Sequence, residues 1–219
     1  MSNRFARSIE LSNKTETMLQ DLPEVVQEWY YSLVASNRSP RTCSEYVRAI
    51  KKFNGFCQQH GVNNFSDLTE KTLTMYMIGS QTKQNKDGEI EPTSFSYRKS
   101  TWSVLNSFVT YLYKREVVKK NYMENVSRPR NSDDVKRYYL TETDFRLILD
   151  CVRKEKYTTS NKPYANSVVS RNILIFMIFM ATGMRRTALS DINMEDIDMD
   201  RHVLTVTDKG NVEHHYYLD

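Results

Sequence analysis

The stretch "ATGMRRTALSDI", residues 181–192, follows the most hydrophobic run of the chain. That run belongs to "ANSVVSRNILIFMIFM", residues 165–180, which is apolar nearly all round and predicts a helix central to a domain core. Gly183 is the kind of residue that adopts the left-handed conformation at a helix end. Two arginines, Arg185 and Arg186, stand directly behind it, where the chain turns back.

An arginine at this position has two interpretations. On pattern alone, arginines after helix ends are usually solvated surface residues. The alternative is a guanidinium held by core packing on one side and open to solvent on the other, beside a short helix over "TALSDI" whose N-terminus adds partial positive charge. Such a guanidinium suits a phosphate group, because its planar fork donates to two oxygens at once.

The flanking segments predict a mixed unit at 138–219. Upstream, "LTETDFRLILDCVRKE", residues 140–155, predicts a helix capped by Thr141, with Asp144 at the capping-box position. Downstream, "HVLTVTDKGNVEHHYYLD", residues 202–219, alternates apolar and polar residues on both sides of "DKGN". This alternation predicts a β-hairpin.

The first part of the chain predicts a helical domain at 23–126. Its clearest helix is "SPRTCSEYVRAIKKFNGFCQQHG", residues 39–61, where Ser39 is a cap, Pro40 takes the first helical position and Gly61 ends the helix. Apolar residues three and four apart predict the other helices of a four-helix domain. These are expected at 21–36, 66–80 and 93–118.

Polar segments separate these elements. "QTKQNKDGEIEP", residues 81–92, reads as a loop, and residues 1–22 as an N-terminal arm. "SRPRNSDDVKR", residues 127–137, has no apolar periodicity and predicts a linker between the two units.

Composition limits the possible partners. Residues 1–137 carry 21 Lys+Arg against 15 Asp+Glu, whereas residues 138–219 carry 10 against 12, which favours an anionic partner for the first part. The N-terminus lacks the apolar core of a signal peptide and the longest apolar run, 173–181, is too short for a bilayer, so a cytoplasmic protein without membrane partners is expected. Three widely spaced cysteines without a CxxC predict neither disulfides nor a zinc site.

The order of these pieces closely resembles a tyrosine recombinase of the phage-integrase family. A basic helical domain, a linker with "RPR", "LTETDFRLIL", "ATGMRRTALSDINMEDID" and a hairpin with "TDKGN" follow one another from about Val25 to the end. The resemblance implies a mainly α protein. A four-helix, SAM-like core-binding domain at 23–126 would precede a truncated α+β catalytic domain with a β-hairpin at 138–219.

The resemblance also implies catalytic roles. Arg185 matches the family's first catalytic arginine and Lys209 its hairpin lysine, while Arg186 has no match and Ala188 stands where the family often has an acidic residue. The family cuts DNA by attack of a tyrosine on phosphorus, without a metal, nucleotide cofactor or small-molecule substrate. Arg185 would then stabilise charge on the phosphoryl oxygens, and Lys209 would protonate the leaving 5′-oxygen, unless it is a simple turn lysine.

Other family residues come after the hairpin. The HxxR motif, a later His or Trp and the nucleophilic tyrosine have no match here, since none of the four histidines has an Arg three positions on. Tyr216 and Tyr217 are expected to be sheet residues. We therefore expect an N-terminal fragment that binds DNA and is inactive alone, and a homo-oligomer on DNA at full length.

DNA contacts are expected on two helices of the first domain. By resemblance, two of its helices face the major groove, and most contacts would be to phosphate. The residues are Arg41, Thr42, Arg48 and Lys52 on one helix, and Tyr97, Arg98 and Lys99 on the other. Two alternatives are a non-catalytic DNA-binding relative that occupies recombination sites, and a helical protein-interaction module with an incidental basic face.

Overall fold

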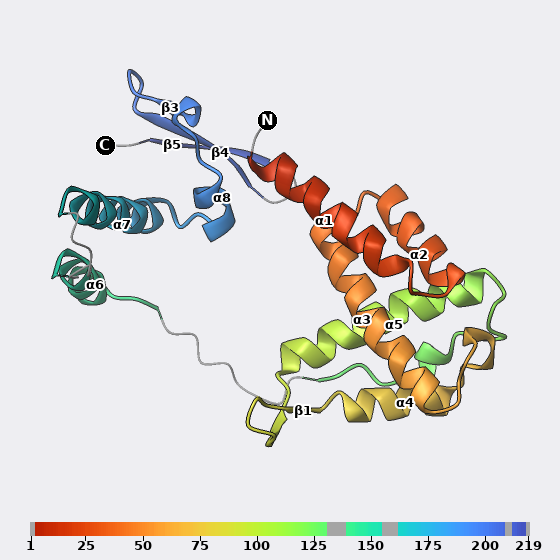
Figure 1. Ribbon diagram of the computed structural model, residues 1–219. Helices are drawn as coiled ribbons and strands as arrows, with labels where there is room; N and C mark the ends of the chain where they lie inside the picture. Colours follow the sequence, from red (N-terminus) through yellow and green to blue (C-terminus); the bar gives the residue numbers. More distant parts are fainter. Residues whose placement is uncertain (1–2, 131–138, 155–161, 209–211, 218–219) are drawn as a thin grey trace. The chain divides into compact units, whose positions relative to one another are not determined.

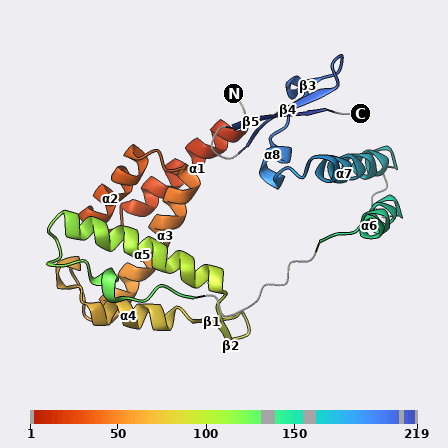
Figure 2. The same cartoon turned by 180° about the vertical axis from the view of Figure 1, so that it is seen from behind.

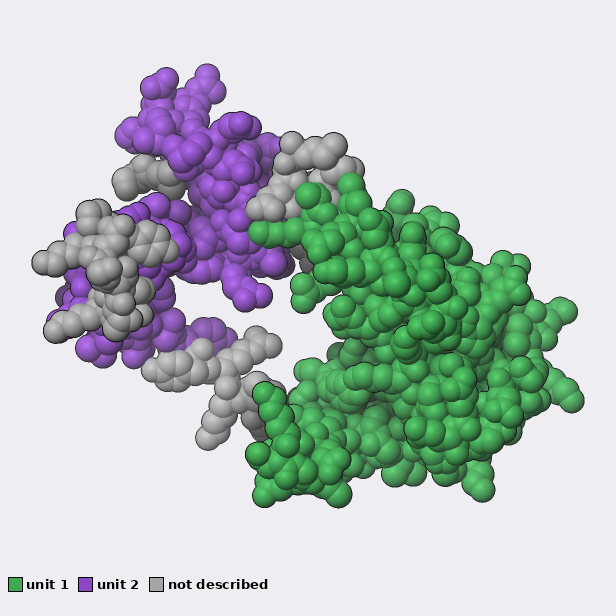
Figure 3. All heavy atoms as spheres, in the orientation of Figure 1, with its two compact units in different colours: residues 1–134 green, residues 135–219 purple. Residues whose placement is uncertain are grey.

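The computed structural model describes residues 3–130, 139–154, 162–208 and 212–217, without the side chains of 3–5 and 162–165. Two compact units divide the chain at residue 134 (Figure 3). The described residues are mostly helical with small antiparallel sheets, as the sequence predicts. Each unit has its own hydrophobic cluster.

The first unit is built around two long helices that cross. These are α3 (Pro40–Gln59) and α5 (Phe95–Lys114), and their crossing is visible in Figures 1 and 2. Around them lie α1 (Asn3–Leu19), α2 (Glu24–Ala35), α4 (Glu70–Gly79), the short strands β1 (Thr82–Gln84) and β2 (Ile90–Pro92), and single turns at Phe65–Asp67 and Tyr122–Asn125.

Aromatic packing forms the core of this unit. The rings of Trp29 and Phe108 meet edge to face at 5.1 Å, and Phe65 meets Phe108 at 5.0 Å. Phe53 stacks on Phe65 at 6.2 Å. Full burial of one such side chain stabilises the fold by about 1.5–3 kcal/mol, so α2, α3 and α5 hold one another in place.

Helix α3 begins and ends as the sequence predicts. The Ser39 hydroxyl accepts from the backbone N–H of Thr42 at 3.2 Å, Pro40 is the first helical residue, and Gly61 beyond the end has φ +75°. The apolar stripe is buried, whereas the charged residues between its members are exposed. The helix therefore has one core face and one polar face.

Two elements of the first unit differ from the sequence prediction. Residues expected as an N-terminal arm form α1, which packs on α3 with Thr15 and Leu19 buried. The Thr15 hydroxyl donates to the carbonyl of Leu11 at 2.7 Å, which satisfies it inside the buried stripe of α1. Because this stripe includes a polar residue, the apolar periodicity of the helix is hard to recognise in the sequence. The expected loop at 81–92 contains β1 and β2, because Asn85 Oδ1 accepts from two backbone N–H groups and closes a turn.

The described residues of the second unit form three helices and a small sheet. Helix α6 is Glu142–Lys154, α7 is Lys162–Thr182 and α8 is Arg186–Ser190. A single turn at Met194–Asp196 leads to the antiparallel sheet, in the order β3 (Ile197–Asp198), β4 (Val203–Asp208) and β5 (Val212–Tyr217). The predicted hairpin is therefore confirmed, although its turn at 209–211 lies outside the described residues, as does most of the predicted linker.

The expectation for α7 is wrong in this structure. Its sequence predicted a helix surrounded by core, but Leu174 is 58% exposed and Met177 54% exposed. Helix α6 packs against α7, with Phe145 edge to face on Phe176 at 5.9 Å, and this contact covers only part of its surface. Thr141 and Asp144 make the predicted reciprocal cap of α6.

The cysteines are all free thiols. Cys43 and Cys57 are buried in the first unit, and burial raises the pKa of the Cys57 thiol to about 12. A thiol in that environment stays protonated and packs as a small apolar group. Across the described residues, we find no helix that combines the length and apolar character needed to cross a membrane.

Candidate active site and nucleic-acid interface

The end of α7 sets the position of the arginine pair. Gly183 has φ +61°, the left-handed conformation predicted for it, and its N–H donates to the carbonyl of Phe179 at 2.9 Å. The Thr182 hydroxyl accepts from the N–H of Met184 at 3.2 Å and donates to the carbonyl of Ile178 at 2.6 Å. These hydrogen bonds define the turn into α8.

Two buried side chains anchor the start of α8. Met184 and Ala188 are 7% and 4% exposed, and they belong to one apolar cluster with Leu204 and Val206 of β4. Arg185 stands between them as the residue that caps α8, with φ −71° and ψ 145°. Core packing thus fixes the backbone on both sides of an arginine whose side chain is 62% exposed.

Arg185 forms an ion pair with Asp208, from its Nη1 to the carboxylate Oδ2. Because side chains alternate along a strand, Asp208 shares a face of β4 with Leu204 and Val206, the face that meets α8. The Asp208 side chain is only 16% exposed. The pair therefore ties the start of α8 to the end of β4.

The other residues of this region take different positions. Lys209 lies outside the described residues. Arg186 is exposed at the start of α8. Tyr216 and Tyr217 lie in β5 as predicted, and Tyr216 pairs with Leu204 in the sheet register while Tyr217 is 78% exposed.

On α3, the charged residues named for DNA contact share the polar face. Arg41, Arg48 and Lys52 are exposed and lie seven and four positions apart, which places them on one side of the helix. Arg48 Nη1 is 3.5 Å from Glu45 Oε1, a surface pair that is worth little and is readily exchanged for another anion. The Thr42 hydroxyl is engaged with Ser39 Oγ at 2.8 Å in the helix cap.

On α5, the named residues occupy the first helical turn. Ser94 Oγ accepts from the N–H of Tyr97 at 3.2 Å and caps the helix. Tyr97 is 41% exposed and Lys99 is exposed, whereas Arg98 is partly buried.

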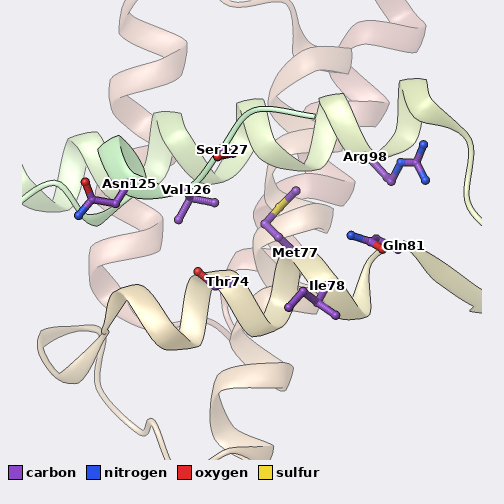
Figure 4. Close-up of a pocket in the computed structure, with 8 residues that line it drawn as sticks. All are labelled: Thr74, Met77, Ile78, Gln81, Arg98, Asn125, Val126 and Ser127. Atoms are coloured by element: carbon purple, nitrogen blue, oxygen red, sulfur yellow. The ribbon is translucent and has the colours of Figure 1, made fainter. Parts of the chain in front are cut away.

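Arg98 lines a hollow of about 250 Å³ beside α4. In Figure 4, Gln81 and Arg98 lie at one end of the hollow, and Asn125 and Val126 at the other. Thr74, Met77, Ile78 and Ser127 complete its lining. Arg98 is the one residue named for DNA contact that lines this hollow.

Asp208 was not predicted as a site residue, because the sequence pattern places it in the turn "DKGN". The signal was present in the alternation of the strand, which places position 208 on the same side as the apolar residues 204 and 206. Its partner could not be found in this way, because Arg185 is 23 positions away.

The fold and site define a class of chain: a helical unit, then a mixed unit with an arginine–carboxylate pair where a short helix meets a β-hairpin. No protein-family profile matches the sequence. Among curated proteins, it is 25% identical to tyrosine recombinase XerC of Bacillus pumilus, over 83% of this chain and 53% of the relative. It is 22% identical to tyrosine recombinase XerS of Streptococcus agalactiae, over 91% of this chain and 65% of the relative.

Two solved structures are similar at lower identity. The integrase of mycobacterium phage Brujita has a TM-score of 0.40 and 19% identity, over 88% of this chain and 57% of that one. The recombinase XerH, solved bound to its difH substrate, has a TM-score of 0.49 and 13% identity, over 95% of this chain and 62% of that one.

Over most of its length, the chain is similar to curated tyrosine recombinases. It spans between about half and two thirds of the length of the curated relatives named above.

The turn at Gly183 gives a first test of how Arg185 is held. A Cβ at this position would meet no atom within 4 Å, so the cost of Gly183→Ala comes from the left-handed backbone alone. We expect a loss of about 1 kcal/mol in the local stability of α8 and β4, measured by amide hydrogen exchange of peptides from these elements.

Gly55→Ala is the matched control. Gly55 lies inside α3, where an added Cβ also meets no atom within 4 Å. Alanine in a helix is about 0.5–1 kcal/mol better than glycine, so protection of α3 should increase. Unchanged exchange in α8 and β4 after Gly183→Ala would contradict the role assigned to the turn.

Proposed function

We propose that this chain is the DNA-binding part and a portion of the active site of a site-specific tyrosine recombinase. The reaction is DNA strand cleavage and rejoining through a 3′-phosphotyrosyl intermediate, with duplex DNA as the substrate. One observation carries the proposal: in a chain whose curated relatives are tyrosine recombinases, Arg185 is fixed between two buried residues while its guanidinium reaches solvent.

The chemistry requires fixed cations near the phosphate. A tyrosine oxygen attacks phosphorus, the 5′-oxygen leaves with a proton, and a second 5′-hydroxyl later attacks the phosphotyrosyl bond and releases the tyrosine. Arg185 is assigned to the nonbridging oxygens, because arginine keeps its charge at every stage. Lys209 is assigned as the general acid that protonates the leaving 5′-oxygen.

The first unit is assigned to hold the duplex. Arg41, Arg48 and Lys52 on α3, with Thr42, would contact phosphates and set the register, together with Tyr97, Arg98 and Lys99 of α5. The excess of basic residues in the first part of the chain supports this assignment. Recombination requires more than one bound subunit, so we assign a homo-oligomer on DNA, in the cytoplasm.

Neighbouring lysines on α3 provide a matched test of DNA binding. Lys51 Nζ is 3.3 Å from Asp21 Oδ2, whereas Lys52 lies on the polar face with Arg41. We expect Lys52→Ala and Arg41→Ala each to reduce the slope of log binding constant against log salt by about 0.9, the value for one lost phosphate contact. Lys51→Ala should reduce it less. Fluorescence anisotropy with a labelled duplex, titrated at several salt concentrations, measures these slopes.

The outcomes separate the proposed function from its alternatives. Absence of salt-dependent DNA binding by the unaltered chain would favour the protein-interaction module. Equal slopes for Lys51→Ala and Lys52→Ala would remove the polar face of α3 from the interface.

A sulfur substitution tests the two catalytic roles in any form of the protein that forms the covalent adduct. Loss of a general acid typically slows a reaction by about 10²–10⁴-fold, so Lys209→Ala should cleave ordinary DNA slowly. Sulfur in place of the bridging 5′-oxygen leaves without a proton and should restore the rate of Lys209→Ala. It should not restore Arg185→Ala, whose defect concerns the nonbridging oxygens.

Single-turnover cleavage on both substrates measures this difference. Equal rescue of the two variants would show that the roles of Arg185 and Lys209 are assigned incorrectly. A normal rate for Lys209→Ala on ordinary DNA would reduce Lys209 to a turn residue and favour a different general acid.

A further inference from the structure

We propose that Asp208 is a positioning residue for Arg185, an inference that rests on the proposed function. Its carboxylate holds the guanidinium in one orientation at the end of β4, so that the remaining N–H groups of Arg185 are presented to a DNA phosphate. Asp208 acts through Arg185 and makes no contact with the DNA itself.

The burial of the two partners shows which one is fixed. The Asp208 side chain is 16% exposed and that of Arg185 is 62% exposed. Asp208 is also a paired residue of β4, opposite Val212 in the register of β4 and β5. A solvent-exposed arginine side chain is therefore bound to a carboxylate whose backbone the sheet holds in place.

Helix α8 itself does not supply this carboxylate. One turn after Arg185 the helix has Ala188, whose methyl group is buried against Leu204 and Val206 of β4. An acidic side chain there would have to be buried in an apolar cluster. The counter-charge for Arg185 consequently comes from the sheet, where the strand ends just before Lys209.

The geometry leaves Arg185 able to bind a second anion. A guanidinium has five N–H donors in a planar fork. The hydrogen bond to Asp208 uses Nη1, and within the described part of the chain no other side-chain hydrogen bond of Arg185 is found. Nε and Nη2 are then available for two oxygens of one phosphate.

Positioning and simple charge neutralisation predict opposite results when Asp208 is changed. If Asp208 only neutralises Arg185, Asp208→Asn removes a negative charge and DNA should bind more tightly. If Asp208 positions Arg185, the same change frees the guanidinium, and the phosphate contact made by Arg185 is lost.

A double-mutant comparison on the whole chain distinguishes these cases. Anisotropy with a labelled duplex is measured across a salt series for Asp208→Asn, Arg185→Ala and both together. Positioning predicts that each single variant, and the double variant, lowers the salt slope by the same amount, about 0.9. Asp208→Glu should keep the original slope. Asp200→Asn removes the same charge from an exposed turn residue of this unit and should leave the slope unchanged.

A second readout is independent of DNA. The order of the Arg185 Nε–H bond, from nitrogen-15 relaxation of the free chain, should fall in Asp208→Asn and recover in Asp208→Glu, while the amide spectrum of β4 is retained. Unchanged order in Asp208→Asn overturns the inference, as does tighter binding by that variant or additive effects in the double variant. If the unaltered chain does not bind DNA, the proposed function is contradicted. The relaxation experiment would still decide whether Asp208 positions Arg185.

Discussion

The contact between α8 and β4 is the constraint on which the candidate active site depends. Met184 and Ala188 from the helix side, and Leu204 and Val206 from the strand, form one small apolar cluster. Without this cluster, nothing would distinguish Arg185 from the other exposed arginines of the chain. Because the residues at positions −1 and +3 from it are buried, its backbone is fixed while its side chain reaches solvent. The ion pair to Asp208 adds a polar restraint at the edge of the apolar one.

The two units differ in how tightly their side chains pack. In the first unit, the packed rings of Trp29, Phe53 and Phe108 hold the helices together. The polar face of α3 lies outside this core and is exposed. Among the described side chains of the second unit, few are fully buried, and α7 has exposed apolar residues such as Leu174. This difference matches the proposed roles, in which the first unit holds an extended anion and the second presents single charged groups at defined positions.

Local signals were sufficient for much of the fold. The Ser39 cap, the Thr141–Asp144 box, the left-handed Gly183 and the hairpin after residue 202 were predictable, because each depends on a few neighbouring residues. Helix α1 and the partner of Arg185 were not, because they depend on contacts between residues far apart. The exposed surface of α7 was also unpredictable, since apolar composition indicates a preference for burial but not what covers a helix. The role of Lys209 came from resemblance and stays a prediction.

Contact between Arg185 and a DNA phosphate can be measured directly from the nuclear magnetic resonance signal of the Arg185 Nε–H group during titration of the chain with duplex DNA. We expect this signal to shift and to saturate with the same affinity as the signals of Arg41 and Arg48, while the signal of Arg201, in a turn of the second unit, stays unchanged. Shifts confined to the arginines of the first unit, with Arg185 unmoved at saturating DNA, would contradict it. The chain would then bind DNA without bringing Arg185 to a phosphate.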